Sequence, residues 1–211
     1  MLLPEALPHL RQVVAADPDN STARYNLGRC LLDMRNFSEA ERVYQEHIER
    51  NPGDAEAFNH LGLARLAKGS PADAESCFRT AIQLNEFDPL FHVNLAQSLA
   101  HLGRASESGE SYERAIELDP SDSGLRTQHG WFLMWSGDTV RAEDRFREAL
   151  QRDPESEGAS AGLAAALRLA RRGARPDFRV FYNSMGAWAS VNHLHFHAFY
   201  LRETLGMYRI I

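Results

Sequence analysis

Residues 55–88 read AEAFNHLGLARLAKGSPADAESCFRTAIQLNEFD, and this stretch decides the fold because its pattern returns along the chain. Apolar residues recur in each half at the three- and four-residue spacing of a helix face, and Gly69 lies between the halves. A glycine at such a midpoint ends one helix and lets the backbone reverse into the next. The stretch therefore predicts a pair of antiparallel helices.

A similar phrase ends each unit of the pattern. The prolines of AADP, ERNP, ELDP and QRDP follow one another at intervals of 34, 68 and 34 residues: Pro18, Pro52, Pro120 and Pro154. The missing member reads QLNEFDP, with its proline displaced to Pro89. Proline stops a helix because it has no amide hydrogen to donate, so each phrase predicts the end of a helical pair. The repeats then begin at residues 21, 55, 89 and 123.

Residue size follows the same period. The eighth position of each repeat is small: Gly28, Gly62, Ala96 and Gly130. The twenty-fourth position is a large aromatic ring: Tyr44, Phe78, Tyr112 and Phe146. A small residue lets a second helix approach closely, and the ring on that second helix fills the space beside it. The pattern favours four similar hairpins over the alternative, an irregular helical bundle.

This pattern resembles the tetratricopeptide repeat (TPR) family over about residues 4–172. The resemblance implies an all-α fold, a right-handed TPR superhelix (α-solenoid) of about ten helices with a short β-prone C-terminal tail. The expected segments are a leading helix in 1–20, repeats in 21–54, 55–88, 89–122 and 123–156, a final helix in 157–173 and a tail in 174–211. The leading helix (Glu5–Ala16) has no partner before it, so its apolar face offers a surface on which a homodimer could form.

In that family the first helix of each repeat lines a concave groove, and the sixth repeat position faces it. Here the sixth position is polar throughout: Asn26, His60, Asn94 and Gln128. Amide side chains both donate and accept, so we expect these residues to hold the backbone of a partner peptide. The alternative is a solvated polar groove with no ligand.

Neighbouring groove positions are expected to supply side-chain contacts: Arg29, Gln97, Trp131 and Trp135. The two tryptophans are four residues apart on one helix face, so we expect them to stack side by side and to bind the partner. In the alternative interpretation they pack against the last helix or the tail.

Composition limits the function classes. The 211 residues carry a formal net charge of −6, so a basic field for nucleic acid or anionic lipid is not expected. We find no 18-residue apolar stretch and no basic region of a secretory signal, and we expect a cytoplasmic protein without a membrane partner. Cys30 and Cys77 are interpreted as small buried hydrophobic residues of a reducing compartment.

Known chemical motifs are sparse before the tail. Lys68, the single lysine, argues against the lysine-based clamp by which some TPR domains hold a carboxylate. No Walker loop, HExxH, GxSxG or zinc-finger spacing occurs there, and we expect neither a metal nor a cofactor. The leading hypothesis is a non-enzymatic scaffold that binds a partner protein or peptide.

The last residues have a different character. Residues 178–201 read FRVFYNSMGAWASVNHLHFHAFYL, which predicts two strands around a turn, with His193, His195 and His197 on one face of the second. This stretch resembles the histidine-triad motif of the GDP-D-glucose and GDP-L-galactose phosphorylases. The resemblance implies that His195 is the nucleophile taking the nucleotidyl group and that His193 and His197 flank it.

Three interpretations of this histidine cluster stay open. It is an inert or remnant strand, a metal site of two or three imidazoles, or a catalytic motif whose sheet another chain completes, because two strands alone build no stable pocket. The second function hypothesis is accordingly a nucleotide-sugar phosphorylase or hydrolase, or a fragment of one. In a third hypothesis, the aromatic tail folds back into the groove and inhibits it.

Overall fold

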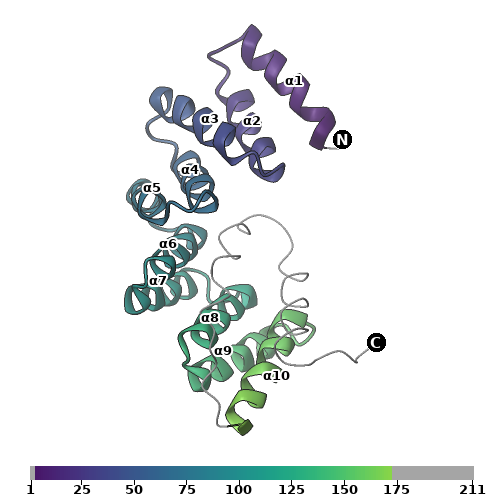
Figure 1. The fold of residues 1–211 in the computed structure, drawn as a ribbon, viewed down its shortest axis with the longest axis vertical. Helices are drawn as coiled ribbons and strands as arrows, with labels where there is room; N and C mark the ends of the chain where they lie inside the picture. The colour runs from purple at the N-terminus through teal and green to yellow at the C-terminus, as the bar shows by residue number, and fades with distance from the viewer. Residues whose placement is uncertain (1–2, 173–211) are drawn as a thin grey trace. The chain divides into compact units, whose positions relative to one another are not determined.

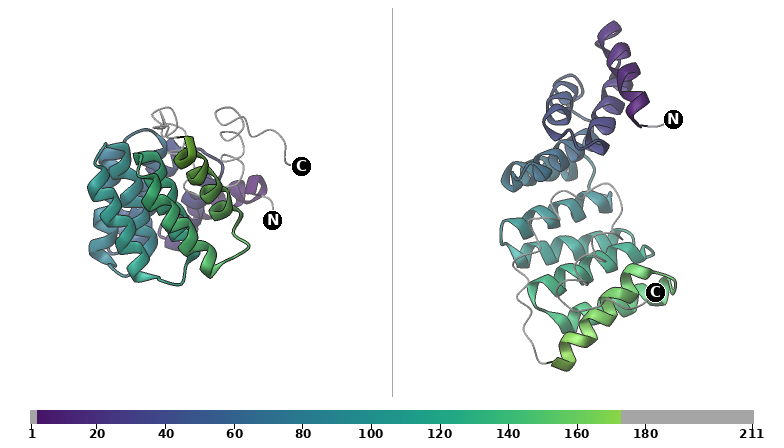
Figure 2. Two further views of the ribbon diagram at one scale, coloured as in Figure 1. Left: turned by 90° about the horizontal axis from the view of Figure 1, so that it is seen from below. Right: turned by 45° about the vertical axis from the view of Figure 1, so that its right-hand side comes forward.

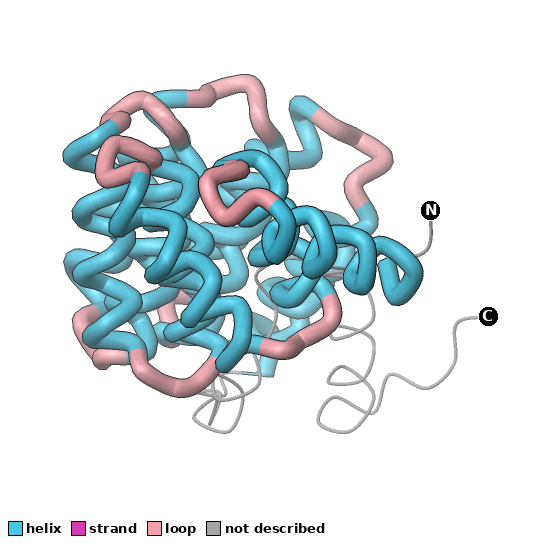
Figure 3. Tube along the Cα trace, turned by 90° about the horizontal axis from the view of Figure 1, so that it is seen from above, coloured by secondary structure: helices cyan, strands magenta, loops and turns pink. Residues whose placement is uncertain are grey.

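The computed structural model describes residues 3–172, all of whose regular elements are helices joined by short loops (Figure 1, Figure 3). These ten helices are α1 Leu3–Ala16, α2 Ser21–Asp33, α3 Phe37–Arg50, α4 Ala55–Ala67, α5 Pro71–Leu84, α6 Pro89–His101, α7 Ala105–Leu118, α8 Ser123–Ser136, α9 Thr139–Arg152 and α10 Glu157–Arg172. The prediction of an all-α solenoid is confirmed for this part of the chain. The β-prone tail in 174–211 lies outside the described residues.

The helices fall into two compact units. The first contains α1–α7 and the second contains α8–α10. Within them α2 packs on α3, α4 on α5, α6 on α7 and α8 on α9, and the two helices of each hairpin lie side by side (Figure 1, Figure 2). In the first unit α3 also packs on α4 and α5 on α6, so successive hairpins stack.

An Asp or Asn at the last position of each repeat begins the next first helix. Its side-chain oxygen accepts a hydrogen bond from a backbone amide of the first turn: Asn20 from Ala23, Asp54 from Ala57, Asp88 from Leu90 and Asp122 from Gly124. Such caps satisfy amides that have no partner inside the helix. Asp88 keeps this role even though the neighbouring proline is displaced, so the repeat register continues unchanged through the QLNEFDP phrase.

The reversal inside each hairpin uses the left-handed backbone region. Gly69, Gly103 and Gly137 have φ of 83°, 76° and 88°, as the prediction of a glycine-terminated first helix requires. Arg35 takes the same place in the first repeat with φ of 60°, the one non-glycine residue of positive φ among those described. This conformation costs a side-chain-bearing residue roughly 1–2 kcal/mol.

The predicted pairing of small residue and ring is confirmed in the three repeats that carry glycine. A Cβ added to Gly28, Gly62 or Gly130 would come within 2.6, 2.5 and 2.6 Å of ring atoms at the twenty-fourth position of the same repeat. Those rings, of Tyr44, Phe78 and Phe146, are fully buried. Close approach of the two helices is therefore what the missing side chain permits.

The apolar face of the leading helix α1 is partly covered by the first repeat. Leu7, Leu10 and Val14 of α1 are partly buried against the core cluster that contains Leu31 and Tyr44. The helix thus uses its apolar face inside the chain, although Val13 stays 43% exposed. The homodimer stays a prediction, and this packing removes the argument first given for it.

Candidate functional site

The predicted groove residues of the first unit lie on α2, α4 and α6, the first helices of three stacked hairpins. Asn26, His60 and Gln97 are half-buried, and Arg29 is exposed. Asn94 is only 9% exposed, which is less than expected of a side chain that is free to bind a peptide. Its hydrogen bonding gives the reason.

Hydrogen bonds join the groove side chains of consecutive repeats. The Asn94 side-chain amide donates to Asn59 Oδ1 at 2.7 Å, and His60 Nε2 lies 3.0 Å from the Tyr25 hydroxyl. Both pairs are 35 residues apart, so each joins the fifth position of one repeat to the sixth position of the next. The polar positions therefore brace one hairpin against the next.

Tyr25 is the centre of a polar aromatic cluster in this face. Its hydroxyl donates to Glu56 Oε2 at 2.6 Å, and its ring lies edge-on to His60 with centroids 5.5 Å apart. The His60 ring in turn stacks on Tyr44, also at 5.5 Å. Three elements, α2, α3 and α4, thus meet through rings and one carboxylate.

Electrostatics in this cluster follow from burial. Burial lowers the pKa of His60 to about 4, with the Arg29 guanidinium adding to the effect, so the imidazole is neutral at pH 7. Burial and the hydrogen bond to Glu56 raise the pKa of the Tyr25 hydroxyl well above its usual value. The cluster therefore presents a neutral imidazole and a neutral phenol beside the exposed cation of Arg29.

A second buried histidine fixes the start of α4. His47 Nε2 lies 2.8 Å from Asp54 Oδ2, and Oδ1 of the same carboxylate caps Ala57. His47 is 1% exposed at the repeat position where Ala81, Ala115 and Ala149 stand. Its role is to hold the helix cap, and the groove does not contain it.

In the second unit, α8 carries Gln128, Trp131 and Trp135, all half-buried. The Trp131 ring meets Phe146 edge-on with centroids 5.3 Å apart, and Trp135 lies 6.0 Å from Phe132. Both indoles thus pack against phenylalanine rings of their own hairpin. The binding role expected of the two tryptophans stays a prediction, because rings that are only partly covered can still contact a partner.

Two interactions escaped the sequence analysis. Asn59 and Glu56 bond the groove residues, yet they occupy the fifth and second repeat positions and do not recur as polar residues in the third repeat, which has Val93 and Leu90. Asn59 lies 35 residues before Asn94, and Glu56 lies 31 residues after Tyr25, so a comparison of equivalent positions 34 residues apart does not pair them.

The remaining predicted site residues, His193, His195 and His197, lie outside the described residues. Among residues 3–172 no group of three or more His, Cys, Asp or Glu side chains is arranged to hold a metal ion. Over the same range, every helix is too short or too polar to cross a bilayer.

Three models of known protein families match different parts of the chain. Two family models described as "Tetratricopeptide repeat" match residues 3–62 and 59–123. A model described as "GDPGP1-like, N-terminal domain" matches residues 159–199, which begins inside α10. GDP-L-galactose phosphorylase 1 of Arabidopsis thaliana is 54% identical over 39 residues, which are 18% of this chain and 9% of that protein. The chain thus spans about a tenth of the length of this curated relative.

Solved structures share the fold. TTC0263, a thermophilic TPR protein of Thermus thermophilus, superposes with a TM-score of 0.68 at 20% identity, covering 79% of this chain and 91% of that one. YrrB, described as a TPR protein with an unusual peptide-binding site, gives 0.59 at 18% identity, covering 92% and 97%. At these identities the likeness is one of fold.

Proposed function

Because the chain belongs to the tetratricopeptide-repeat family, we propose that it is a scaffold that binds an extended segment of a partner protein along the face formed by α2, α4 and α6. The observation that carries this proposal is the bonded side-chain array of that face. Tyr25 with His60, and Asn59 with Asn94, are already positioned by hydrogen bonds, so a peptide meets groups that need little further ordering.

The array keeps hydrogen-bonding capacity for a ligand. The Asn94–Asn59 bond uses one amide hydrogen and one carbonyl, and each side chain has a second polar group. Asn26 adds a further amide, and Arg29 adds an exposed cation with no ion pair in the described part of the chain. In the second unit, Gln128 with the partly buried Trp131 and Trp135 is the proposed counterpart.

The proposal is tested with phage-displayed random dodecapeptides selected on the purified full chain. Arg29→Ala is expected to weaken binding of a selected peptide at least about tenfold by fluorescence anisotropy, since a hydrogen bond to a charged group contributes about 1.5–3 kcal/mol. Asn26→Ala is expected to weaken it about two- to tenfold, since a neutral hydrogen bond contributes about 0.5–1.5 kcal/mol. Arg42→Ala is the matched control, because Arg42 is an exposed arginine of α3 that pairs with Glu46. Equal losses for Arg29→Ala and Arg42→Ala would count against the groove.

We further propose a cytoplasmic location. Cys30 and Cys77 are both buried and form no disulfide within the described residues, which suits a reducing cytoplasm. The net charge of −6 favours a neutral or basic partner segment over nucleic acid. A homodimer is a further proposal, which sedimentation at two concentrations tests.

A second candidate is a nucleotide-sugar phosphorylase activity, supported by the 54% identity to GDP-L-galactose phosphorylase 1. The resemblance assigns His195 as nucleophile with His193 and His197 beside it. Purified chain incubated with GDP-D-glucose and inorganic phosphate would then consume the sugar nucleotide, and His195→Ala would abolish this consumption. No turnover, together with no binding of GDP by calorimetry, eliminates the candidate.

A further inference from the structure

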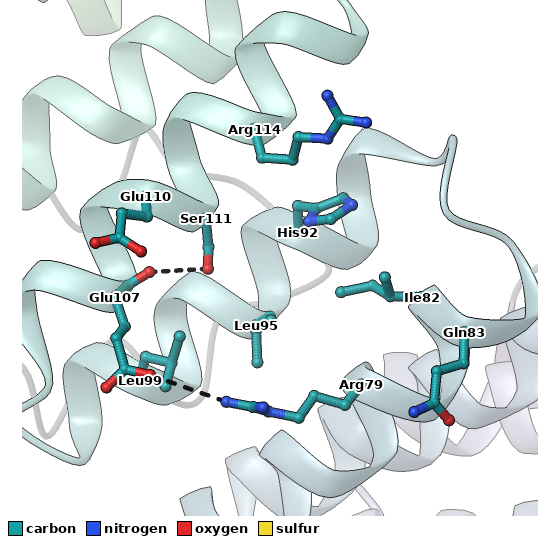
Figure 4. Close-up of a pocket in the computed structure, with 10 residues that line it drawn as sticks. All are labelled: Arg79, Ile82, Gln83, His92, Leu95, Leu99, Glu107, Glu110, Ser111 and Arg114. Carbon is teal, nitrogen blue, oxygen red and sulfur yellow. Dashed lines mark hydrogen bonds and ion pairs between the residues drawn. The ribbon is translucent and has the colours of Figure 1, made fainter.

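A hollow of about 390 Å³ opens in the first unit between α5, α6 and α7 (Figure 4). Its floor is aliphatic, with Ile82 from α5 and the core residues Leu95 and Leu99 from α6, which are 9% and 1% exposed. The volume is near the lower end of the roughly 300–1,000 Å³ typical of ligand pockets. Charged side chains of α5 and α7 form its rim.

The hollow lies away from the proposed groove. On α6 it is lined by His92, Leu95 and Leu99, whereas the groove positions of that helix are Asn94 and Gln97. At about 100° per residue these two sets project from opposite faces of the helix. An occupant of the hollow therefore leaves the groove accessible.

Comparison with the preceding repeat explains the hollow. Arg65 of α4 lies between α3 and α5, where its Nε is 3.1 Å from Glu41 Oε1 and its Nη1 is 3.2 Å from Cys77 Sγ. One repeat later the equivalent residue is Leu99, whose side chain is shorter and has no polar group to bond an acid or a thiol on either side. A space that a guanidinium takes in one repeat is left open in the next.

The glutamates beside Arg65 and beside Leu99 also differ in their ion-pair partners. Glu75, the equivalent of Glu41, is bonded instead to Arg79 and Arg104, each at 2.7 Å. At the rim, Arg114 pairs with Glu117 at 3.0 Å, and Glu107 pairs with Arg104. These ion pairs neutralise most of the charge around the hollow.

Glu110 is the exception on the rim. Its carboxylate accepts a long hydrogen bond of 3.4 Å from Ser106 Oγ, and no cation of the described residues pairs with it. It is exposed and lines the hollow from α7, beside Glu107 and Ser111 (Figure 4). The hollow therefore combines apolar surface with one unneutralised negative charge.

We propose that this hollow is a second docking site, which takes an aliphatic side chain of a partner protein carried directly next to a lysine or arginine. The aliphatic group packs on Ile82 and on the exposed edge of Leu95, and the neighbouring cation pairs with Glu110. The chain's net charge of −6 assists the approach of such a basic segment. A scaffold with this site holds two segments at once, one in the groove and one on the opposite face of α6.

The site is tested by nuclear magnetic resonance on the full ¹⁵N-labelled chain, titrated with three capped tetrapeptides: Gly-Leu-Arg-Gly, Gly-Ser-Arg-Gly and Gly-Leu-Glu-Gly. The Leu-Arg peptide is expected to shift the backbone amides of Gln83, Leu95 and Ser111 saturably. The other two are expected to bind at least about fivefold more weakly, because one loses the apolar burial and the other reverses the charge.

Variants locate the binding. Leu99→Arg, which reproduces the natural Arg65, and Ser111→Arg, which fills the hollow from its rim, are both expected to abolish the saturable shifts. Ser111 is half-buried and arginine is the better helix former, so the second variant keeps the test valid if the first fails to fold. Glu110→Gln is expected to weaken binding about two- to fivefold. Glu49→Gln, at an exposed carboxylate of α3, is the matched control.

Several results overturn the proposal. Shifts that survive Ser111→Arg, or equal binding of the Leu-Arg and Leu-Glu peptides, contradict it. Shifts at the hollow that depend on protein concentration without any peptide identify a second copy of the chain as the occupant. Arg29→Ala is expected to leave the Leu-Arg titration unchanged, so failure of the groove and failure of the hollow are distinguishable.

Discussion

Replacing Phe78 with alanine is expected to lower the free energy of unfolding by about 3–5 kcal/mol. The ring is fully buried in the cluster that also contains Leu63, Leu95 and Leu99. It lies against Gly62, which has no side chain to move into the cavity that the substitution leaves. Urea denaturation followed by circular dichroism measures the change.

Phe87→Ala is the matched control for this substitution. Phe87 stands in the turn between α5 and α6 and is 70% exposed, so its loss is expected to change stability by less than about 0.5 kcal/mol. Comparable costs for the two substitutions would contradict the pairing of ring and glycine as the basis of the hairpin.

Lowering the pH from 7 to 5 is expected to destabilise the chain through its buried histidines. Burial lowers the pKa of His60 and of His101 to about 4, and burial with two nearby arginines lowers that of His129 to about 3. In the unfolded chain these groups titrate near about 6.5, so between the two values the unfolded state binds more protons. Stability is therefore complete above about pH 6.5 and falls as the pH drops towards 4.

The expected loss of stability at low pH is large, and substitution shows which histidine causes it. Each pKa unit corresponds to about 1.4 kcal/mol, so the three histidines together account for several kcal/mol by pH 4. The midpoints of urea denaturation at pH 7.5, 6 and 5 measure this loss of stability. Lys68 and Arg65 lower the pKa of Glu41, so this carboxylate begins to protonate only below that pH range. His60→Gln is expected to reduce the fall in the urea midpoint between pH 7.5 and pH 5. The substitution is expected to change the midpoint at pH 7.5 by less than this reduction. A parallel dependence in the variant and the parent chain would exclude His60 as a source.

The hairpins were predictable because their packing is local and repeated. Gly62 with Phe78 lies in one repeat and recurs as Gly28 with Tyr44, so size alone identified the contact. The Asn59–Asn94 and Tyr25–His60 bonds were not predicted, since each joins unlike positions of two repeats and depends on how the hairpins stack. The hollow beside Leu99 depends on the same stacking and on which residue replaces Arg65.

The cover over the two tryptophans and the helix caps were not predicted from the sequence. Trp131 and Trp135 share a helix face as expected, yet Phe146 and Phe132 cover part of them, and periodicity carries no information on such cover. The helix caps at Asp54 and Asp88 were not singled out, although their repeat position is as regular as that of the rings.

Hydrogen exchange of the full chain, with and without a dodecapeptide selected from the phage library, tests whether the first helices of the hairpins form a peptide-binding face. Amide exchange in α2, α4 and α6 is expected to be slower when the peptide is bound. Unchanged exchange in all three helices, with the peptide bound, would contradict this binding face.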